Sequence, residues 1–551
     1  MRLSWNLLLL ACAAATTSHA ITYDTWKAQA FTTTEAEDPL ISGDLADPDK
    51  DGLNNLLEYA LYGAPKAANP ALFPRGNRSA PGGALTLEYK RRREALDLDY
   101  VVEVSDDLVT WKSGFAHVWT TDAVPSDSMT INSVPLVVTD AVTATSQLAV
   151  GSGGRQFMRL KVIRSARAGI RNQLALEGKS PSAMLAACQI PTGTYAGYIS
   201  KYVFPAAVQD RLLNAPANWY LASVALSHFV ESQPDLVKAH VNRYIAYKLA
   251  DGTHRIKDPD IFSDNTTGTG YTPWTLWQDN TSDSDDAYAG TLLLLACRYQ
   301  QLYPSDSWFE DIIPALKDIA YYNIARQAKT DEDEKVYVKA TDSAKTFNGL
   351  IRNFQKGTPN ANVGYLMDNV QAWAGVNALA DAMERVGWDG NDVTYYRGWS
   401  VAIAQAVHRV LWDEDLQAWR SDDTLNTGHA SGKSPLFSAQ VSPFYSKLHC
   451  QLFPQLYGMP YPGSSAETQR RNNMAWKWVV DHMPNWTQSG EWPPSDPFSH
   501  LEIAVIAAQM GETQQVADFL NMARLRWLPG GTVANGTVSE QVGYWQRLVG
   551  H

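Results

Sequence analysis

The chain has 551 residues, and its apolar share of 45% and charged share of 19% are those of a globular protein with large cores. This length exceeds one ordinary domain, so two or three domains are expected. The net charge of −12 argues against a nucleic-acid partner. Binding phosphates requires clustered Lys and Arg, and the sequence has no such tract beyond residues 90–93.

The first 20 residues have the features of a secretory signal peptide. A basic Arg2 precedes an apolar run at residues 7–15, and small residues follow at 18–20. The sequence therefore predicts a bacterial protein that is secreted, periplasmic or at the cell surface. The alternative is a lipoprotein anchored at Cys12. No other stretch approaches the ~18 continuous apolar residues of a membrane span, so no transmembrane helix is expected.

Residues 21–72 form a short helical segment that contains the acidic stretch DPDKDGLNNLLE. Side-chain oxygens fall at positions one, three, five, nine and twelve of this loop, and Gly52 occupies position six. This is the ligand spacing of an EF-hand-type calcium loop, in which glycine permits the sharp turn. The expected ligands are Asp47, Asp49, Asp51, Asn55 and Glu58. The alternative is an acidic turn that caps the following helix.

The wording of this stretch also resembles thrombospondin type 3 or dockerin-like calcium segments of secreted bacterial proteins. A dockerin carries two such loops, whereas only one is found here. The resemblance therefore implies a structural calcium ion rather than docking to a cohesin, and no cofactor is expected for catalysis.

Residues 83–163 change character to short alternating runs such as LTLEYKRR, LDYVVEVS and FMRLKVI, separated by Gly, Asp, Ser and Pro. This pattern predicts a small antiparallel β-sandwich that serves as an accessory domain. Trp111 and Trp119 are more simply explained as core residues than as a platform for sugars. The basic stretch 164–182 is predicted to be a linker.

From residue 183 to the end the pattern is helical, and the helices come in pairs. Helices are expected at 206–231, 234–249, 285–302, 307–327, 362–386, 392–413, 437–457, 464–483, 497–510, 513–527 and 538–548. Breaks within a pair are short and breaks between pairs are long, which gathers the long loops on one rim. A further helix near 183–190 would give six hairpins.

The stretch DNTSDSDDAYAGTLLLLA places four carboxylates directly before and within the start of an apolar helix. Aspartates in a first turn are favoured by unpaired N–H groups and by the helix dipole. Capping needs only one or two of them, however, and clustered carboxylates are a common way to shift pKa values at functional sites. The excess acid therefore indicates a site as well as a cap.

The paired helices, together with DSDDAYAGTLLLLA and YLMDNVQAWAGVNALADA, resemble the six-hairpin glycosidase superfamily over residues 183–551. The resemblance implies a mainly α chain whose catalytic domain is an (α/α)6 toroid, here preceded by the β-sandwich. It also implies a carbohydrate substrate. The D-S-x-D-A-Y segment of that superfamily matches Asp283, Asp286 and Tyr288, and its L-M-D-N segment matches Asp368.

Hydrolysis of a glycosidic bond requires one carboxylic acid to protonate the leaving oxygen and one carboxylate to activate water or attack the sugar. We expect Asp286 and Asp368 to form this pair, with Asp283 as a capping or orienting neighbour. Glu491 is the reserve acid, because Trp492 and Pro493 could remove water from around it and raise its pKa. The sequence predicts a glycoside hydrolase of unknown linkage specificity.

Aromatic residues near these acids suit a carbohydrate cleft, because a flat ring stacks on the apolar face of a pyranose. The candidates for contact with substrate are Trp274, Trp277, Trp486, Trp492 and Tyr288. Two alternatives stay open. A polysaccharide lyase acting on uronic acids could use Tyr445, His449 and Arg352, and a non-catalytic glycan-binding surface protein would use no acid.

Overall fold

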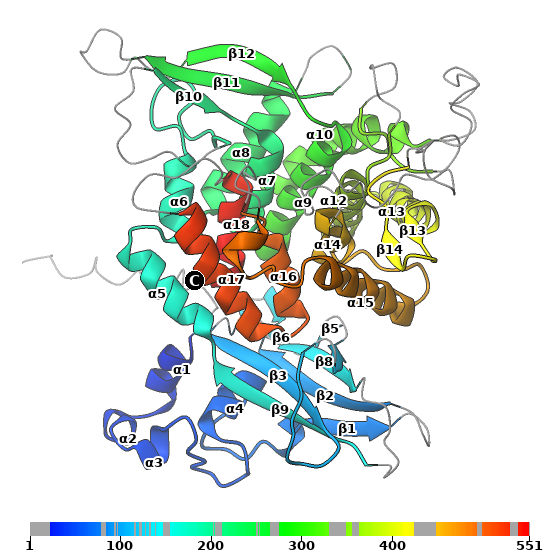
Figure 1. The fold of residues 1–551 in the computed structure, drawn as a ribbon. Helices are drawn as coiled ribbons and strands as arrows, with labels where there is room; N and C mark the ends of the chain where they lie inside the picture. Colours follow the sequence, from blue (N-terminus) through cyan, green and yellow to red (C-terminus); the bar gives the residue numbers. More distant parts are fainter. Residues whose placement is uncertain are drawn as a thin grey trace, which may run out of the picture.

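The fold is that of a computed structural model, which describes residues 22–78, 84–92, 95, 97–114, 117–120, 124–126, 128–131, 134–137, 139–146, 155–201, 203, 212–248, 252, 254–264, 275–329, 349–354, 363–423, 448–492, 499–528 and 538–549. A mainly helical part follows a smaller N-terminal part that contains most of the strands (Figure 1). The mainly helical character expected for residues 183–551 is therefore confirmed.

Six helices of the C-terminal part pack side by side in a closed ring. In ring order these inner helices are α7 (Trp219–Ser227), α9 (Asp286–Leu302), α12 (Leu366–Arg385), α14 (His449–Leu456), α16 (Glu502–Gln509) and α18 (Ser539–Val549). Each contacts the next, and α18 contacts α7 to close the ring. This is the arrangement that the paired helix pattern predicts.

Most inner helices are joined to an outer helix that follows them in the chain. The outer helices are α8 (Pro234–Tyr247), α10 (Trp308–Asn323), α13 (Gly390–Val410), α15 (Ser465–His482) and α17 (Thr513–Trp527). The sixth inner helix, α18, packs instead against α5 (Ala166–Leu176) and α6 (Pro181–Cys188), which precede the ring in the chain. The helix expected near 183–190 is α6.

The segment 164–182, expected to be a linker, contains α5 and the start of α6. The side chain of Ser165 accepts a hydrogen bond from the Arg167 N–H and caps α5, and Leu174 is fully buried. Basic composition suggested an exposed connection, but the apolar face of α5 packs against α17 and α18. The segment is therefore a structural part of the ring.

Helices α9 and α12 cross very closely because glycines face each other where they meet. A Cβ atom added to Gly290 would lie 2.4 Å from the Gln371 carbonyl oxygen, and one added to Gly375 would lie 2.3 Å from the Gly290 carbonyl oxygen. Gly543 plays the same part between α18 and α7, where an added Cβ would lie 2.7 Å from Ala225 Cα. Only glycine allows backbones to approach this closely.

The long connection before α9 is not irregular, because it carries two strands of a three-stranded antiparallel sheet. The sheet has the order β10 (Leu212–Pro216), β11 (Lys257–Asp264) and β12 (Thr275–Thr281). The helix expected at 206–231 is thus too long: residues 212–216 of it form β10, and α7 begins only at Trp219, while residues 206–211 lie outside the described residues. A short hairpin of β13 (Trp412–Asp413) and β14 (Ala418–Trp419) follows α13.

The N-terminal part contains small antiparallel sheets. Their strands are β1 (Arg75–Arg78), β2 (Leu85–Arg92), β3 (Leu98–Ser105), β4 (Val118–Thr120), β5 (Val124–Pro125), β6 (Ser128–Ile131), β7 (Val134–Val137), β8 (Thr139–Ser146) and β9 (Phe157–Arg164). Strands β1, β2, β8 and β4 form one sheet in that order, and β3 pairs with β9 in another. Leu87 and Val142 of the first sheet share a core with Val104 of the second. The β-sandwich itself stays a prediction.

Short helices precede these strands: α1 (Tyr23–Ala30), α2 (Thr33–Ala36), α3 (Pro39–Ser42) and α4 (Asn55–Leu61). Tyr23, Trp26 and Tyr59 form an aromatic core with Leu98 of β3, so the helices and strands form one unit. This unit lies at the end of the helical part opposite the β10–β12 sheet (Figure 1).

Candidate active site

The inner helices begin at the same end of the ring, and each carries a polar side chain in its first turn. These residues are Tyr220 of α7, Asp286 of α9, Asp368 of α12, His449 of α14, Glu502 of α16 and Glu540 of α18. Electrostatic interactions join Asp286 to Asp368, and join His449, Glu502, Glu540 and Tyr220 in turn. We call this set the first-turn cluster.

Asp286 is fully buried at the start of α9, with 0% of its surface exposed. Its Oδ1 accepts a hydrogen bond of 3.0 Å from the Ala287 N–H, and its Oδ2 has no hydrogen-bond partner among the described residues. Burial, followed by the nearby charge of Asp368, raises the pKa of Asp286 well above its ordinary value. Burial therefore favours the protonated form of Asp286.

Asp368, in the first turn of α12, is only half-buried. Burial and the charge of Asp283 raise the pKa of Asp368 to about 7, against a hydrogen bond from Ser284 that lowers it. The close crossing of α9 and α12 is what brings the two first turns together. The structure thus places Asp286 and Asp368 side by side and leaves Asp283 exposed beside them.

Tyr288, expected to contact substrate, instead belongs to a buried hydrogen-bond network. Its hydroxyl donates to Asp258 Oδ2 at 2.6 Å and accepts from the Asn218 side chain at 2.7 Å. Burial is the main cause that raises the pKa of Asp258 to about 6, and the charge of Asp283 adds to it. The network joins the start of α7 to β11 and α9, and sequence reasoning had not singled out Asp258.

Asp285 is the N-cap residue of α9, but its side chain does not cap the helix. Its Oδ1 accepts a hydrogen bond of 2.9 Å from Arg255 Nε in an ion pair that is largely buried. The Ser284 hydroxyl accepts from the Ala287 N–H instead. The carboxylates of this stretch therefore have different partners. Asp285 pairs with Arg255 at the helix start, whereas Asp286 and Asp283 interact electrostatically with Asp368.

Glu502 and Glu540 form a second pair of buried carboxyls that the sequence analysis did not select as catalytic. Burial, followed by the charge of Glu502, raises the pKa of Glu540 well above its ordinary value. One oxygen of each, Glu502 Oε2 and Glu540 Oε1, has no hydrogen-bond partner within the described part of the chain. The available signal was an acid in the first turn of a helix, but many helices begin in that way.

A layer of hydrogen-bonded side chains connects the two carboxyl pairs. Gln371 Nε2 donates to the Tyr220 hydroxyl at 2.8 Å and to the Tyr457 hydroxyl at 2.9 Å. Burial, the charge of Glu540 and, less strongly, the charge of Asp368 raise the pKa of Tyr220 well above its ordinary value. Tyr220 therefore lies within electrostatic reach of both pairs.

Two of the tryptophans expected to stack on sugars are core residues. Trp486 and Trp492 are 2% and 1% exposed, and the Trp492 indole donates to the Trp486 carbonyl oxygen at 2.8 Å. Both rings pack against Phe519 of α17. Neither ring offers a face to a substrate, because both are buried against the outer helix α17.

Other expected residues lie apart from the first-turn cluster or cannot be placed. Glu491 ends a short 3-10 helix (Ser489–Glu491) and accepts a hydrogen bond of 3.1 Å from Asn485 in an exposed setting. Arg352 is buried and donates to the carbonyl oxygens of residues 327 and 328. Trp274, Tyr445 and the side chains of Trp119 and Trp277 lie outside the described residues.

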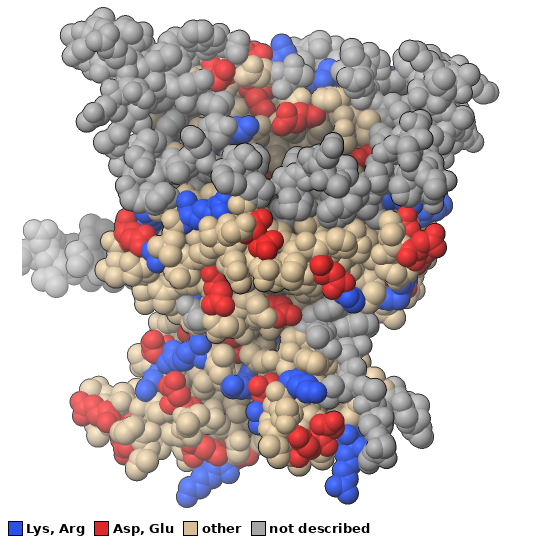
Figure 2. Space-filling view, in the orientation of Figure 1, with Lys and Arg blue, Asp and Glu red and all other residues tan. Residues whose placement is uncertain are grey.

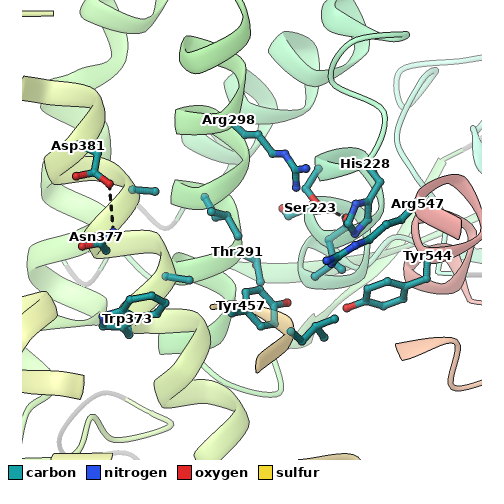
Figure 3. A pocket seen from close by; sticks show the side chains of 16 residues that line it. Ser223, His228, Thr291, Arg298, Trp373, Asn377, Asp381, Tyr457, Tyr544 and Arg547 are labelled. Atoms are coloured by element: carbon teal, nitrogen blue, oxygen red, sulfur yellow. Dashed lines mark hydrogen bonds between the residues drawn. The ribbon is translucent and has the colours of Figure 1, made fainter. Parts of the chain in front are cut away.

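A cavity of about 330 Å³ lies further along the inner helices, beyond Gln371 on α12 (Figure 3). Arg298, His228 and Arg547 point into one side of it, and Asp381 lies on the other side, where Asn377 donates to it (Figure 3). The residues that line this cavity do not include the first-turn carboxyls. It is therefore a feature of the ring interior, separate from the candidate active site.

The acidic loop at residues 47–58 has part of the geometry that a calcium ion requires. Carboxylate oxygens of Asp47, Asp49 and Asp51 lie within 4.8 Å of one another. Asp47 Oδ1 and Asp49 Oδ2 are buried and accept no hydrogen bond from any described residue. Burial, then the charges of Asp51, Asp49 and Asp47, raise the pKa of Glu58 to about 7, against a hydrogen bond from Asn69 that lowers it.

Gly52 has a φ of 97°, as the sharp turn at position six requires. Asn55 fits the expected ligand set least well. Its amide nitrogen donates to the Ile41 and Gly43 carbonyl oxygens, both at 2.8 Å, so this side chain joins α3 to α4. Of the expected ligands, the structure therefore clusters Asp47, Asp49 and Asp51, whereas Asn55 has a structural task.

On the face shown in Figure 2, the described acidic and basic side chains are interspersed rather than gathered by sign. None of the described helices is both long enough and apolar enough to span a membrane.

Comparison with known proteins gives similarity at the level of structure only. No family model matches the sequence, and no curated protein matches it. The chain is similar to a rhamnosidase from Klebsiella oxytoca with rhamnose bound, with 11% identity, a TM-score of 0.38 and coverage of 88% of this chain and 91% of that chain.

It is also similar to a GH78 family rhamnosidase of Bacillus sp. GL1, with 11% identity, a TM-score of 0.33 and coverage of 87% and 48% of the two chains. A family 76 glycoside hydrolase from a bovine Bacteroides thetaiotaomicron strain is similar with 8% identity, a TM-score of 0.37 and coverage of 87% of this chain and 98% of that chain. These structural neighbours are glycoside hydrolases.

Proposed function

We propose that the protein is a glycoside hydrolase whose acid and base are drawn from the carboxyls around the starts of α9 and α12. The observation that carries this proposal is the coupled pair of Asp286 and Asp368, which two closely crossed helices hold together with raised pKa values. Glycoside hydrolysis needs one protonated and one ionised carboxyl at the same pH. Two adjacent carboxyls meet that need because loss of the first proton hinders loss of the second.

The two members differ in access to solvent, and this difference suggests their roles. Asp368 is half-buried with a pKa near neutrality, so it suits the transfer of a proton to the leaving oxygen. Asp286 is fully buried and, in this proposal, shares one proton with Asp368, so that it serves as the base when Asp368 is protonated. The exposed Asp283 is proposed as the orienting neighbour of the pair.

The test is release of reducing ends from a panel of polysaccharides and oligosaccharides, with ultraviolet absorbance recorded in parallel. We expect reducing ends without new absorbance. For the most active substrate, Asp368→Asn and Asp286→Asn should each lower kcat by at least about 100-fold, since a positioned acid contributes about 10²–10⁴-fold. Circular dichroism and glycan binding should change little.

The matched control is Asp311→Asn, which removes an exposed carboxylate from the first turn of outer helix α10. It should retain full activity. Unchanged turnover in both site variants would refute the assignment of the pair. New ultraviolet absorbance would identify a lyase, and binding without turnover would identify a glycan-binding protein.

We further propose that the loop of Asp47, Asp49, Asp51 and Glu58 binds a structural calcium ion, and that residues 1–20 direct export of the chain. The buried carboxylate oxygens support the first proposal, and the basic, apolar and small-residue pattern supports the second. N-terminal sequencing of exported protein tests the signal peptide. A mature chain that starts at residue 21 supports it, whereas a mature chain that starts at a lipid-modified Cys12 would identify a lipoprotein instead.

A further inference from the structure

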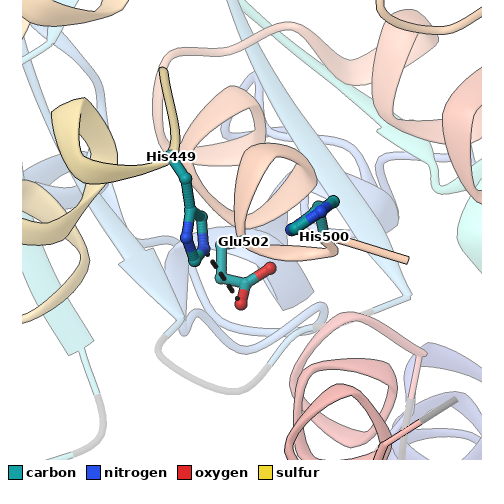
Figure 4. A group of neighbouring side chains, drawn as sticks. All are labelled: His449, His500 and Glu502. Carbon is teal, nitrogen blue, oxygen red and sulfur yellow. Dashed lines mark ion pairs between the residues drawn. The ribbon is translucent and has the colours of Figure 1, made fainter. Parts of the chain in front are cut away.

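Two histidines and a glutamate meet at the starts of α14 and α16, away from the pair of Asp286 and Asp368. His449 is the first residue of α14, Glu502 is the first residue of α16, and His500 precedes it by two positions. All three are buried, with exposures of 6%, 2% and 1% for His449, His500 and Glu502. The first-turn cluster is therefore not uniform, because one side of it carries imidazole nitrogen as well as carboxylate oxygen (Figure 4).

The ligand atoms of this group lie close enough together to bind one metal ion. One ligand atom from each residue lies within 4.8 Å of the others, and His449 Nε2 lies 3.3 Å from Glu502 Oε1. Tetrahedral zinc with bonds of about 2.0–2.1 Å places neighbouring ligand atoms about 3.3 Å apart. In Figure 4 both imidazole rings approach the same carboxylate.

The surrounding side chains hold these groups in place. Gln541 Nε2 donates to Glu502 Oε1 at 2.9 Å, and Trp492 stacks on His500 at a ring separation of 5.7 Å. His500 has a φ of 42°, a left-handed conformation that is costly for a residue with a side chain. Glu502 Oε2 is buried and has no hydrogen-bond partner in the part of the chain that the structure describes.

We propose that His449, His500 and Glu502 bind a divalent transition-metal ion, with Zn²⁺ as the expected occupant. Two imidazole nitrogens and one carboxylate oxygen suit Zn²⁺ rather than Ca²⁺ or Mg²⁺, which prefer oxygen ligands. Three protein ligands leave a fourth position open for water or for a hydroxyl of a bound molecule. This site is independent of the proposed hydrolase pair and of the calcium loop.

The experiment measures Zn²⁺ bound to the full chain by elemental analysis after equilibration with Zn²⁺ in excess Ca²⁺, followed by gel filtration. We expect one equivalent for the unaltered protein and less than about one tenth for His449→Gln and for His500→Gln. The matched control His482→Gln, at the exposed end of α15, should retain one equivalent. Binding equal to the unaltered protein in both ligand variants would overturn the proposal.

A second measurement on the unaltered protein keeps the test independent of variant folding. X-ray absorption at the zinc edge should report two imidazole ligands at about 2.0–2.1 Å. A spectrum without imidazole, or no retained zinc, would overturn the site and leave a His–Glu ion pair in its place. Neither result depends on glycoside hydrolysis, so failure of the zinc site and failure of the hydrolase proposal are distinguishable.

Discussion

At the scale of single residues, the candidate active site depends on how differently the carboxyls of one short stretch are surrounded. Asp285 is neutralised by Arg255, Asp283 faces solvent, and Asp286 is enclosed with one oxygen that no described residue bonds. Three acids within four positions therefore do three different things. The sequence shows their number, but burial and partners decide their chemistry.

The first prediction concerns the pH dependence of Asp368. Because the pKa of Asp368 is raised to about 7, a role as proton donor requires its protonated form, which disappears as the pH rises through about 7. The ratio kcat/KM should therefore fall about tenfold per pH unit above about 7. Initial rates measured from about pH 5 to pH 9 check this, and a rate that rises across that range would contradict the assignment.

The second prediction concerns a buried ion pair near the start of α12. Lys329 and Asp423 are almost fully buried, and Asp423 also accepts from the Gly364 N–H. Lys329→Met should destabilise the fold by about 3–5 kcal/mol, because it leaves an uncompensated buried carboxylate. The comparison is Lys317→Met, which breaks a half-exposed pair with Asp392 and should cost about 0–1 kcal/mol. Equal denaturation midpoints for the two variants would contradict this reasoning.

At the scale of helices, much of the fold could be predicted from the sequence. Helix α17 was expected at 513–527 and runs from Thr513 to Trp527, and α9 begins within one residue of its expected start. These helices have clear apolar periodicity and recognisable ends. The stretch LLNAP was read as helix, but it pairs with β11, since a partner distant in sequence decides strand formation.

The candidate site could be predicted only in part. Asp286 and Asp368 each stand at a helix start, and that pattern is visible in the sequence. Their neighbourhood depends on the glycine crossing of α9 and α12, which no local pattern reveals. Trp486 and Trp492 lie between helices in the sequence, yet both side chains are buried in the core. The burial of a loop residue is a tertiary property, and composition alone does not fix it.

The third prediction tests the glycine crossing. Gly290→Ala would place a methyl group 2.4 Å from the Gln371 carbonyl oxygen, so α9 and α12 must move apart. We expect a loss of about 1–3 kcal/mol in stability and a fall in activity, because the first turns separate. The control is Gly398→Ala in α13, where an added Cβ meets nothing within 4 Å and should stabilise the helix by about 0.5–1 kcal/mol. Equal melting temperatures for the two variants would refute the account.

At the scale of the whole molecule, the N-terminal unit lies at the far end of the ring from the β10–β12 sheet (Figure 1). Gly114 of this unit approaches Glu512, which lies in the turn between α16 and α17. The first-turn residue Glu502 is at the other end of α16. The N-terminal unit therefore contacts the end of the ring away from the candidate active site, and a change in its stability need not alter the site geometry.

The fourth prediction concerns calcium and pH in this unit. The raised pKa of Glu58, about 7, means that the folded state holds its proton more tightly than the unfolded state, whose pKa is about 4.3. Without Ca²⁺, the stabilisation present below about pH 4 should be lost as the pH rises to about 7. Ca²⁺ should restore stability at pH 7 and above, because it binds the ionised carboxylates.

Thermal unfolding at pH 7 with Ca²⁺ or with a chelator measures this effect. The melting temperature of the N-terminal unit should be several degrees higher with Ca²⁺ than with the chelator. Glu58→Gln should remove both the response to Ca²⁺ and the loss with rising pH. Glu35→Gln, which changes a half-exposed carboxylate of α2 outside the acidic loop, should leave both in place. A response to Ca²⁺ that survives Glu58→Gln would place the ion elsewhere.

The packing of α5 and α6 against the last inner helix, α18, has a consequence for how the chain folds. Glu177 in the turn after α5 pairs with Arg524 of α17, a partner 347 positions later in the sequence. During synthesis the first and last members of the ring meet only after all the intervening hairpins have emerged. The apolar sides of α7 and α6 stay exposed to solvent until α18 packs against them. Such late, long-range contacts slow folding and leave intermediates prone to aggregation. An unfinished ring has two open edges, so the ring gains its full stability only when the last helix is in place.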